Sequence, residues 1–191
     1  MKHPFKPFIL QNSKNMIIGT LPPDNIEYYY SNSANTRMWD LLKSIKEERA
    51  IQQNSYLISK DDKQNLLTNL NLSMTDIILE YKREKDSTAD KDIIPIKYNN
   101  IENIINNTSI KNLLFVYESA LQWFLHSLNK KAPIKLSKLP PLKNKKYDVM
   151  HTTLLNQKSV NCILLPNPLN RGRKGENLEF KKEVYKKYIE H

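Results

Sequence analysis

The sequence reads IIGTLPP at residues 17–23, and this stretch decides how the rest of the chain is interpreted. Only three glycines occur in the chain, and Gly19 stands between a short apolar run and the pair Pro22–Pro23. The prolines prevent a strand or helix from continuing, while glycine allows the backbone to turn sharply or to approach another group closely. The other two glycines, Gly172 and Gly175, follow a second apolar run. All three therefore come just after predicted buried strands, where open α/β sheets place their ligand sites.

The composition indicates a globular chain whose residues 1–191 form one domain. Hydrophobic residues make up 39% and charged residues 26%, which is typical of a protein with a packed core. No apolar stretch approaches the ~18 residues that a membrane span needs, and residues 1–10 have no signal-peptide pattern. The single cysteine, Cys162, excludes an internal disulfide and a four-cysteine metal site. We therefore expect a cytoplasmic protein without membrane contact, metal or organic cofactor.

Positive charge is the most informative bulk property of the chain. Thirty Lys and Arg residues against twenty Asp and Glu residues give a net charge of +10 and a pI near 9.5. Such a surplus favours a polyanionic partner, most simply nucleic acid, although a lysine- and asparagine-rich composition also follows from a biased genome. The cations gather at Arg171, Arg173 and Lys174 and again at Lys143, Lys145 and Lys146. The first of these groups lies in a predicted ligand loop.

Short apolar runs alternate with amphipathic segments along the chain. The apolar runs predict strands, and hydrophobic residues at i, i+3, i+4 and i+7 predict helices. Strands are expected at residues 15–20, 75–81, 110–117 and 160–166, and helices at residues 36–49, 101–105, 118–128 and 176–191. Residues 63–70 have some helical spacing as well. This order predicts an α/β protein in which helices cover both faces of a short, mainly parallel sheet of four strands, giving three layers.

The spacing also predicts which side chains face the core. Trp39 is expected to be buried in the first helix. The predicted inward residues of the later helices are Leu121, Phe124, Leu125 and Leu128, followed by Phe180, Val184, Tyr188 and Ile189. Three consecutive tyrosines, at residues 28–30, offer flat faces for base stacking, but they cannot all point inward from an extended segment.

Three segments in order resemble the uracil-DNA glycosylase superfamily: IIGTLPP at 17–23, YYYSNSANTRMW at 28–39 and LLPNPLNR at 164–171. They are most similar to the branch that includes mismatch-specific uracil and hypoxanthine glycosylases. The similarity extends to residues 3–23, 72–95 and 110–124, so it covers most of the chain. It implies an α/β/α fold and a monofunctional DNA glycosylase that flips a base and hydrolyses its N-glycosidic bond without a cofactor.

The resemblance implies a base pocket built around the first segment. Its wall would be formed by Gly19, Thr20, Leu21 and Pro22, with Tyr30 as the tyrosine of the pocket. Many members of the superfamily have Asp or Asn at the position of Leu21, where it positions the attacking water, and leucine cannot do that. The hypoxanthine-type branch is also apolar there and relies on an asparagine further along the chain.

Three residues are candidates for the catalytic role. The family's asparagine matches Asn35, but the spacing to Trp39 is one residue longer here, so Asn32 is an alternative. Asp24 is the nearest carboxylate to the first segment and is a candidate general base. Asn35 is also well placed to cap the helix that follows.

The third segment resembles the family's minor-groove loop. Pro168 and Leu169 would present an apolar wedge that fills the space left by the flipped nucleotide. The resemblance implies DNA contacts from the residues that follow, namely Asn170, Arg171, Arg173 and Lys174. Leu165 replaces the His or Asn that the family often has, which removes a hydrogen bond to the base and argues for an altered substrate.

Two alternative functions remain open. Asp76, Glu80 and Lys82 resemble the D…ExK arrangement of metal-dependent nucleases, although Asp76 is expected to support the end of its strand or the pocket. The apolar Leu21 and Leu165 also suit a non-catalytic nucleic-acid-binding protein on the same fold. For a glycosylase, uracil and hypoxanthine are the targets that the resemblance implies. The altered positions leave open a hypermodified cytosine of phage DNA, and hence a role in defence instead of repair. We expect a monomer that acts on double-stranded or single-stranded DNA.

Overall fold

The computed structural model describes most of the chain. The described residues are 1–23, 26–30, 37–48, 59–85, 87, 89–129, 131–142, 147, 150–155, 158–169 and 177–189.

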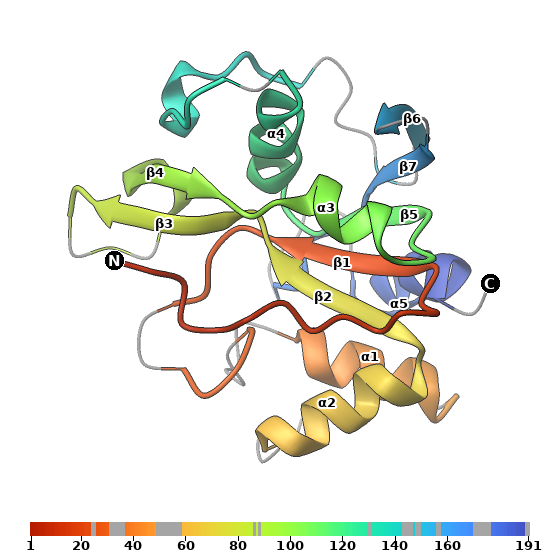
Figure 1. Cartoon of the computed structure of the whole chain (residues 1–191). Helices are drawn as coiled ribbons and strands as arrows, with labels where there is room; N and C mark the ends of the chain where they lie inside the picture. The colour runs from red at the N-terminus through yellow and green to blue at the C-terminus, as the bar shows by residue number, and fades with distance from the viewer. Residues whose placement is uncertain are drawn as a thin grey trace.

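The centre of the fold is a five-stranded sheet with the strand order β2-β1-β5-β7-β6 (Figure 1). Its strands are β1 (Asn15–Gly19), β2 (Leu72–Asp76), β5 (Asn112–Phe115), β6 (Met150–Leu155) and β7 (Lys158–Leu164). The strands β2, β1, β5 and β7 are parallel, which confirms the predicted four-stranded parallel sheet. The fifth strand, β6, pairs antiparallel with β7 and was not predicted. Its threonines interrupt the apolar run that marks the other strands, and only pairing with β7 makes it a strand.

Helices cover both faces of this sheet and give the predicted three layers (Figure 1). On one face lie α1 (Met38–Lys46), α2 (Lys60–Asn69) and α5 (Leu178–Ile189), and on the other lie α3 (Ile101–Asn106) and α4 (Glu118–Ser127). Within β1, Met16 and Ile18 pack toward α3 and α4, whereas Ile17 packs toward α1, α2 and α5. Because both faces are buried, the strand is a continuous apolar run instead of an alternating one.

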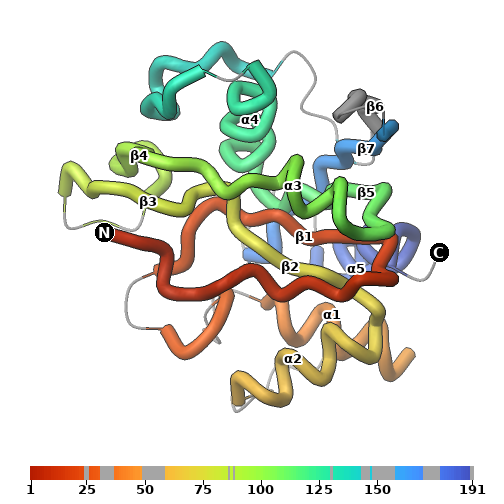
Figure 2. Tube along the Cα trace, viewed as in Figure 1, coloured from red at the N-terminus to blue at the C-terminus, as the bar shows by residue number. Residues whose placement is uncertain are grey.

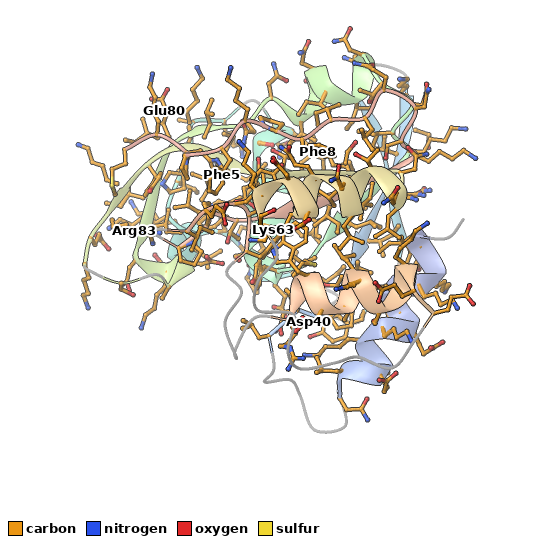
Figure 3. All side chains as sticks on the ribbon, turned by 90° about the horizontal axis from the view of Figure 1, so that it is seen from below. Phe5, Phe8, Asp40, Lys63, Glu80 and Arg83 are labelled. Atoms are coloured by element: carbon orange, nitrogen blue, oxygen red, sulfur yellow. The ribbon has the colours of Figure 1, made fainter. Side chains whose placement is uncertain are left out.

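A two-stranded antiparallel hairpin extends from the end of β2. It consists of β3 (Ile78–Arg83) and β4 (Ile93–Tyr98), with the 3₁₀ turn η1 (Asp90–Asp92) immediately before β4. The predicted single strand at 75–81 was therefore wrong in extent, because the chain leaves the central sheet at Ile77 and changes partner. Figure 3 shows Glu80 and Arg83 on this hairpin and Asp40 and Lys63 on helices α1 and α2.

The first residues of the chain run along the edge of β2 and reach the hairpin (Figure 2). Phe8 forms a bridge with Met74 of β2, and Lys2 forms one with Glu80 of β3. The His3 amide also donates to the Leu79 carbonyl at 2.8 Å. This N-terminal segment therefore ties β2 and the hairpin together at the end of the sheet where the parallel strands finish.

The predicted inward faces of two helices need correction. Phe180 and Leu125 are 41% and 38% exposed, so neither belongs to the core. The buried side of α5 instead consists of Lys181, Lys182, Tyr185 and Ile189. Lys181 is buried because its Nζ donates to the Leu169 carbonyl at 2.6 Å, a contact that helical periodicity cannot reveal. Trp39 is buried as predicted.

Candidate active site

The carboxyl ends of the parallel strands gather the polar residues of interest. Successive parallel strands are added on opposite sides of β1, with β2 on one side and β5 on the other, so a topological switch point lies beside β1. In open α/β sheets, ligands bind outside the carboxyl ends of the strands at such a point. We call this region the carboxyl edge; it comprises Gly19–Pro22, Tyr30, Asp76, Asp90, Tyr117–Ser119 and Leu165–Leu169.

Gly19 ends β1 in close contact with two other residues. A Cβ atom added to Gly19 would lie 2.2 Å from Asp76 Oδ1 and 2.4 Å from Tyr30 Oη. Both separations are well inside van der Waals contact, so a side chain at this position would displace one of these groups. The glycine at the start of GTLPP is therefore required by the close approach of a carboxylate and a phenol.

Asp76 forms a buried hydrogen bond with His3. His3 Nε2 lies 2.9 Å from Asp76 Oδ2, and the two side chains are 0% and 4% exposed. The backbone of Asp76 is also held, because Asn99 Nδ2 donates to its carbonyl at 2.6 Å. These contacts hold both the side chain and the backbone of Asp76 at the end of its strand. Sequence reasoning gave His3 no role, because its partner lies 73 residues away and no local pattern connects the two.

Tyr30 is buried beside Gly19 with an unusual backbone conformation. Its φ angle is +54°, in the left-handed region that side chains rarely adopt. Burial raises the pKa of its hydroxyl well above the ordinary value, and the nearby Asp76 carboxylate raises it further. Among the described residues, the hydroxyl has no hydrogen-bond partner. A strained residue with an unsatisfied polar atom is unusual in a folded protein and marks a candidate functional position.

The expectation that the tyrosines at residues 28–30 cannot all point inward was wrong. All three are buried, with exposures of 3%, 1% and 7%. The left-handed turn at Tyr30 breaks the extended geometry that would have forced one of them outward. Tyr29 Oη donates to the Lys6 carbonyl at 3.0 Å, and Tyr28 packs against Tyr29 and Trp39. Tyr28 and Tyr29 therefore belong to the core and do not offer faces for base stacking.

Asp90 is a carboxylate at this edge that the sequence did not single out. Its two oxygens accept from Thr20 Oγ1, at 3.0 Å, and from Ser119 Oγ. Burial raises the pKa of Asp90, and the two hydroxyl hydrogen bonds only partly offset this effect. The hairpin that carries Asp90 is also tied to the same loop, because Arg83 Nη2 donates to the Pro22 carbonyl at 3.4 Å. Asp90 escaped prediction because it lies in a polar segment between two strands, where only the tertiary fold reveals its partners.

Tyr117 follows β5 by two residues and lies near Asp90 and Asp76. Burial raises the pKa of its hydroxyl, and the carboxylates of Asp90 and Asp76 raise it further. The phenols of Tyr30 and Tyr117 and the carboxyl group of Asp90, all with raised pKa values, thus gather at one end of the sheet, an arrangement common at sites of binding and catalysis.

The loop after β7 is anchored at the same edge. Leu165 is fully buried, and the Pro166 carbonyl accepts from Tyr185 Oη at 2.8 Å. The Arg37 amide donates to the Pro168 carbonyl at 2.8 Å, and Lys181 Nζ donates to the Leu169 carbonyl. The backbone of Leu169 is therefore fixed while its side chain remains half-exposed. Both signature loops of the sequence end at the carboxyl edge.

The structure brings together only part of the predicted site. Gly19, Thr20, Leu21, Pro22 and Tyr30 lie at the carboxyl edge with Pro168 and Leu169. The three catalytic candidates, Asn35, Asp24 and Asn32, lie outside the described residues. The same is true of Asn170, Arg171, Arg173 and Lys174.

The residues of the nuclease alternative do not form a metal-ligand group. Asp76 is occupied by His3, and Glu80 lies on β3 in register with Lys97. Across the described part of the chain, no three His, Cys, Asp or Glu side chains are grouped so that they could hold a metal ion. In the same residues, none of the helices has the length and apolar character needed to cross a membrane.

Comparison with known proteins gives a match in structure only. No protein-family model and no curated protein sequence matches the chain. Among solved structures, it is similar to a protein from Methanosarcina acetivorans, determined by solution NMR and described as a "putative Uracil DNA glycosylase". The match has a TM-score of 0.62 and 18% sequence identity, and it covers 98% of this chain and 97% of that chain. The chain therefore has an α/β/α fold like that of this uracil-DNA-glycosylase-like structure.

Proposed function

We propose that the protein is a monofunctional DNA glycosylase that hydrolyses the N-glycosidic bond of a flipped base and leaves an abasic site. The observation that carries this proposal is the fold shared over nearly the whole of both chains with the Methanosarcina acetivorans protein. The net charge of +10 and the convergence of two signature loops at the carboxyl edge support it. The protein is proposed to act as a cytoplasmic monomer on DNA.

The proposed chemistry needs a pocket, a water and a stabilised sugar. A glycosylase turns the target nucleotide out of the stack and must stabilise the oxocarbenium-like sugar while water attacks. In this proposal, Gly19–Pro22 and Tyr30 contact the base and Asn35 positions the water or the sugar. Asp24 is the second choice, as general base, and Asn32 is the alternative asparagine. No step requires a metal or an organic cofactor.

The loop after β7 is proposed to contact the DNA. The half-exposed side chain of Leu169 is the wedge, and its fixed backbone favours this role because a wedge must resist displacement by the stacked bases. Pro168 shapes the turn, and the contacts to the DNA backbone come from Asn170, Arg171, Arg173 and Lys174.

Two classes of target base are proposed. Uracil and hypoxanthine are the default targets, because the sequence resemblance implies both and the similar structure is described as a "putative Uracil DNA glycosylase". The buried Leu165 cannot hydrogen bond to a base through its side chain, and Leu21 cannot position water. These two apolar positions favour a second candidate, a hypermodified cytosine of phage DNA, which would make the protein a defence factor.

Base release measured with a chelator present tests the proposal. The panel contains duplexes with uracil, hypoxanthine or mismatched thymine, and genomic DNA from phages with natural and with modified cytosine. Strand breaks that appear only after alkali support a glycosylase, and the responsive DNA decides between repair and defence. Breaks that need magnesium and no alkali would replace the proposal with the nuclease. Binding without breaks would favour a non-catalytic protein on the same fold.

Single variants then test the catalytic roles. Replacing the water-positioning residue by alanine should lower single-turnover base release by about 100-fold or more. Asn35→Ala, Asn32→Ala and Asp24→Ala are compared, with Asn129→Ala, an exposed residue after α4, as the control. Full base release by all three variants would contradict the assigned mechanism.

The DNA contacts have a separate readout. Each phosphate contact that is lost should reduce the salt slope of DNA binding by about 1. We expect this reduction for Arg171→Ala and for Arg173→Ala but not for Lys131→Ala, a control at an exposed position. Leu169→Ala should lower base release from duplex DNA more than from single-stranded DNA. Only in a duplex does the flipped nucleotide leave a gap in the base stack that Leu169 is proposed to fill. An unchanged salt slope together with an unchanged duplex preference would remove this loop from the interface.

A further inference from the structure

Asp90 is a partly buried carboxyl group that the roles assigned so far do not use. It reaches the carboxyl edge from the hairpin and not from a strand of the central sheet. Its contacts join three parts of the chain that are far apart in sequence: the loop after β1, the turn before β4 and the first turn of α4.

The hydroxyl groups on either side of Asp90 are themselves buried. Thr20 is 3% exposed and Ser119 is 7% exposed. Thr20 Oγ1 donates to Asp90 Oδ1, and Ser119 Oγ donates to Asp90 Oδ2. Each oxygen of the Asp90 carboxylate accepts a hydrogen bond from one hydroxyl. This one carboxylate therefore links the GTLPP loop to the start of α4 and sets the distance between them. These are the two segments on either side of the switch point.

We propose that Asp90 is a positioning residue of the candidate active site, holding the Thr20 and Ser119 hydroxyls so that the loop after β1 stays fixed against α4 during base excision. This inference rests on the proposed function and concerns the geometry of the same site. Asp90 acts through Thr20 and Ser119 and is not placed in contact with the substrate.

The hydrogen-bond arrangement depends on the protonation of Asp90. An ionised carboxylate only accepts, so both hydroxyls donate to it and both hydrogens point toward Asp90. A protonated carboxyl group donates one bond, so one of the hydroxyls must accept and turn its own hydrogen elsewhere. The two states therefore hold the Thr20 loop differently. The ionised state, which orders both hydroxyls, is the competent one.

The surroundings of Asp90 set the pH at which this change occurs. Asp76 of β2 raises the pKa of Asp90, and Arg83 of β3 lowers it, while burial is the largest effect and raises it. Tyr117 also faces the group. Within the same turn, Lys91 is exposed and Asp92 is buried. Because the net shift of the pKa is upward, competence is lost as the pH falls through a value above the ordinary pKa of an aspartate.

The test compares pH profiles of single-turnover base release at saturating DNA, on whichever DNA of the panel responds. Asp90→Asn keeps the shape of the side chain, but its amide NH₂ cannot accept, so one hydroxyl must reverse. We expect about a 100-fold loss of rate with DNA affinity nearly unchanged, and the acid-side decline of the wild type should be absent. Thr20→Val and Ser119→Ala should each lower the rate and should add little to Asp90→Asn. Asp61→Asn, an exposed carboxylate on α2, is the matched control.

Thermal unfolding separates positioning from simple destabilisation. A raised folded-state pKa means that ionised Asp90 costs stability, which is lost as the pH rises. The neutral Asp90→Asn protein should therefore be at least as stable as wild type at neutral pH. Slow catalysis by a stable variant supports the proposal. A variant with wild-type rate and an unchanged acid-side decline would overturn it, as would a rate loss fully explained by a low Tm.

The proposed function can fail separately from this inference. If the wild type releases no base from any DNA, the glycosylase proposal fails. The same comparison is then made on hydrogen exchange of the backbone amides in the Thr20 loop as the pH is lowered. Acid-induced loss of protection that is absent in Asp90→Asn would retain the positioning role, and the same loss in the variant would reject it.

Discussion

Two regions of the molecule differ in packing: one is an open apolar groove, and the other, the carboxyl edge, is closely packed. A groove of about 490 Å³ lies between α4 and the segment after it, which includes the 3₁₀ turn η2 (Leu136–Lys138). Its lining is largely apolar, with Leu121, Leu125, Leu139, Pro140, Pro141 and Leu142. Gln122 Nε2 fixes one side by donating to the Pro140 carbonyl at 2.8 Å. The carboxyl edge, in contrast, packs Gly19, Asp76 and Tyr30 against one another with no room for an added Cβ.

The difference shows that chemical convergence, and not volume, marks the candidate site. Among the described residues that line the groove there is no carboxyl group or phenol. At the carboxyl edge, Tyr30, Asp90 and Tyr117 all have raised pKa values and lie on separate elements. Apolar pockets often bind ligands, but cleavage of a glycosidic bond requires polar groups held in fixed positions. Four substitutions test this comparison.

The largest effect is expected from breaking the buried His3–Asp76 hydrogen bond. His3→Ala leaves the buried Asp76 carboxyl group without this partner, which should lower the free energy of unfolding by about 3 kcal/mol. Chemical denaturation of the variant measures this loss. The double variant His3→Ala/Asp76→Ala should lose less than the sum of the two single variants. Strict additivity would mean that the pair does not couple the N-terminal segment to the carboxyl edge.

A side chain at Gly19 should have the next largest effect. Gly19→Ala places a Cβ where Asp76 Oδ1 and Tyr30 Oη lie, and such overpacking costs about 1–3 kcal/mol. Base release should fall further than stability, because the displaced groups belong to the site. Gly19→Val should be worse than Gly19→Ala in both denaturation and single-turnover assays. Wild-type behaviour of Gly19→Ala would show that this edge is looser than the observed packing.

Removing the Tyr30 hydroxyl should separate stability from activity. The buried hydroxyl has no partner among the described residues, so Tyr30→Phe should leave stability unchanged or raise it by about 1 kcal/mol. Because Tyr30 is proposed to contact the flipped base, the same variant should also lose base release. Tyr29→Phe is the matched control, since its hydroxyl has a partner in the Lys6 carbonyl and its loss should destabilise. Lower stability of Tyr30→Phe without loss of activity would contradict this interpretation.

The smallest effect is expected in the apolar groove. Leu125 is already 38% exposed, so Leu125→Ser should change the free energy of unfolding by less than about 0.5 kcal/mol. Base release and DNA affinity should stay at wild-type values. Lower base release with unchanged stability would show that the groove takes part in function and would reverse the contrast between the two regions.

Local sequence patterns predicted the parallel strands of the central sheet well, but they predicted the hairpin β3–β4 and the edge strand β6 poorly. The runs ending at Gly19, Phe115 and Leu164 are strands because both of their faces are buried, and such runs are visible in sequence. The hairpin β3–β4 and the edge strand β6 are less apolar, and their pairing decides their structure. Phe180 was misassigned because helical spacing gives a period and leaves its phase open. In the structure the buried side of α5 carries Lys181, which contacts the Leu169 carbonyl, and Phe180 lies on the exposed side.

The candidate site, like the fold, was only partly predicted from the sequence. The sequence marked the GTLPP loop and the loop ending at Leu169, because glycine and proline reveal turns whatever their surroundings. It did not reveal His3 or Asp90, whose partners are 73 and 70 residues away. A polar residue in a loop has the same local pattern whether it is solvated or bonded across the molecule.

The sequence by itself determined the α/β class, the four parallel strands and the two loops that follow them, because strand apolarity and turn chemistry are local properties. Only the tertiary structure decided which charged and hydroxyl groups meet at the carboxyl edge. That meeting depends on the N-terminal segment pairing with β2 and β3 and on the hairpin carrying Asp90 to Thr20 and Ser119. Burial then shifts the pKa of Asp90 upward, an effect that exists only once the chain has folded around it.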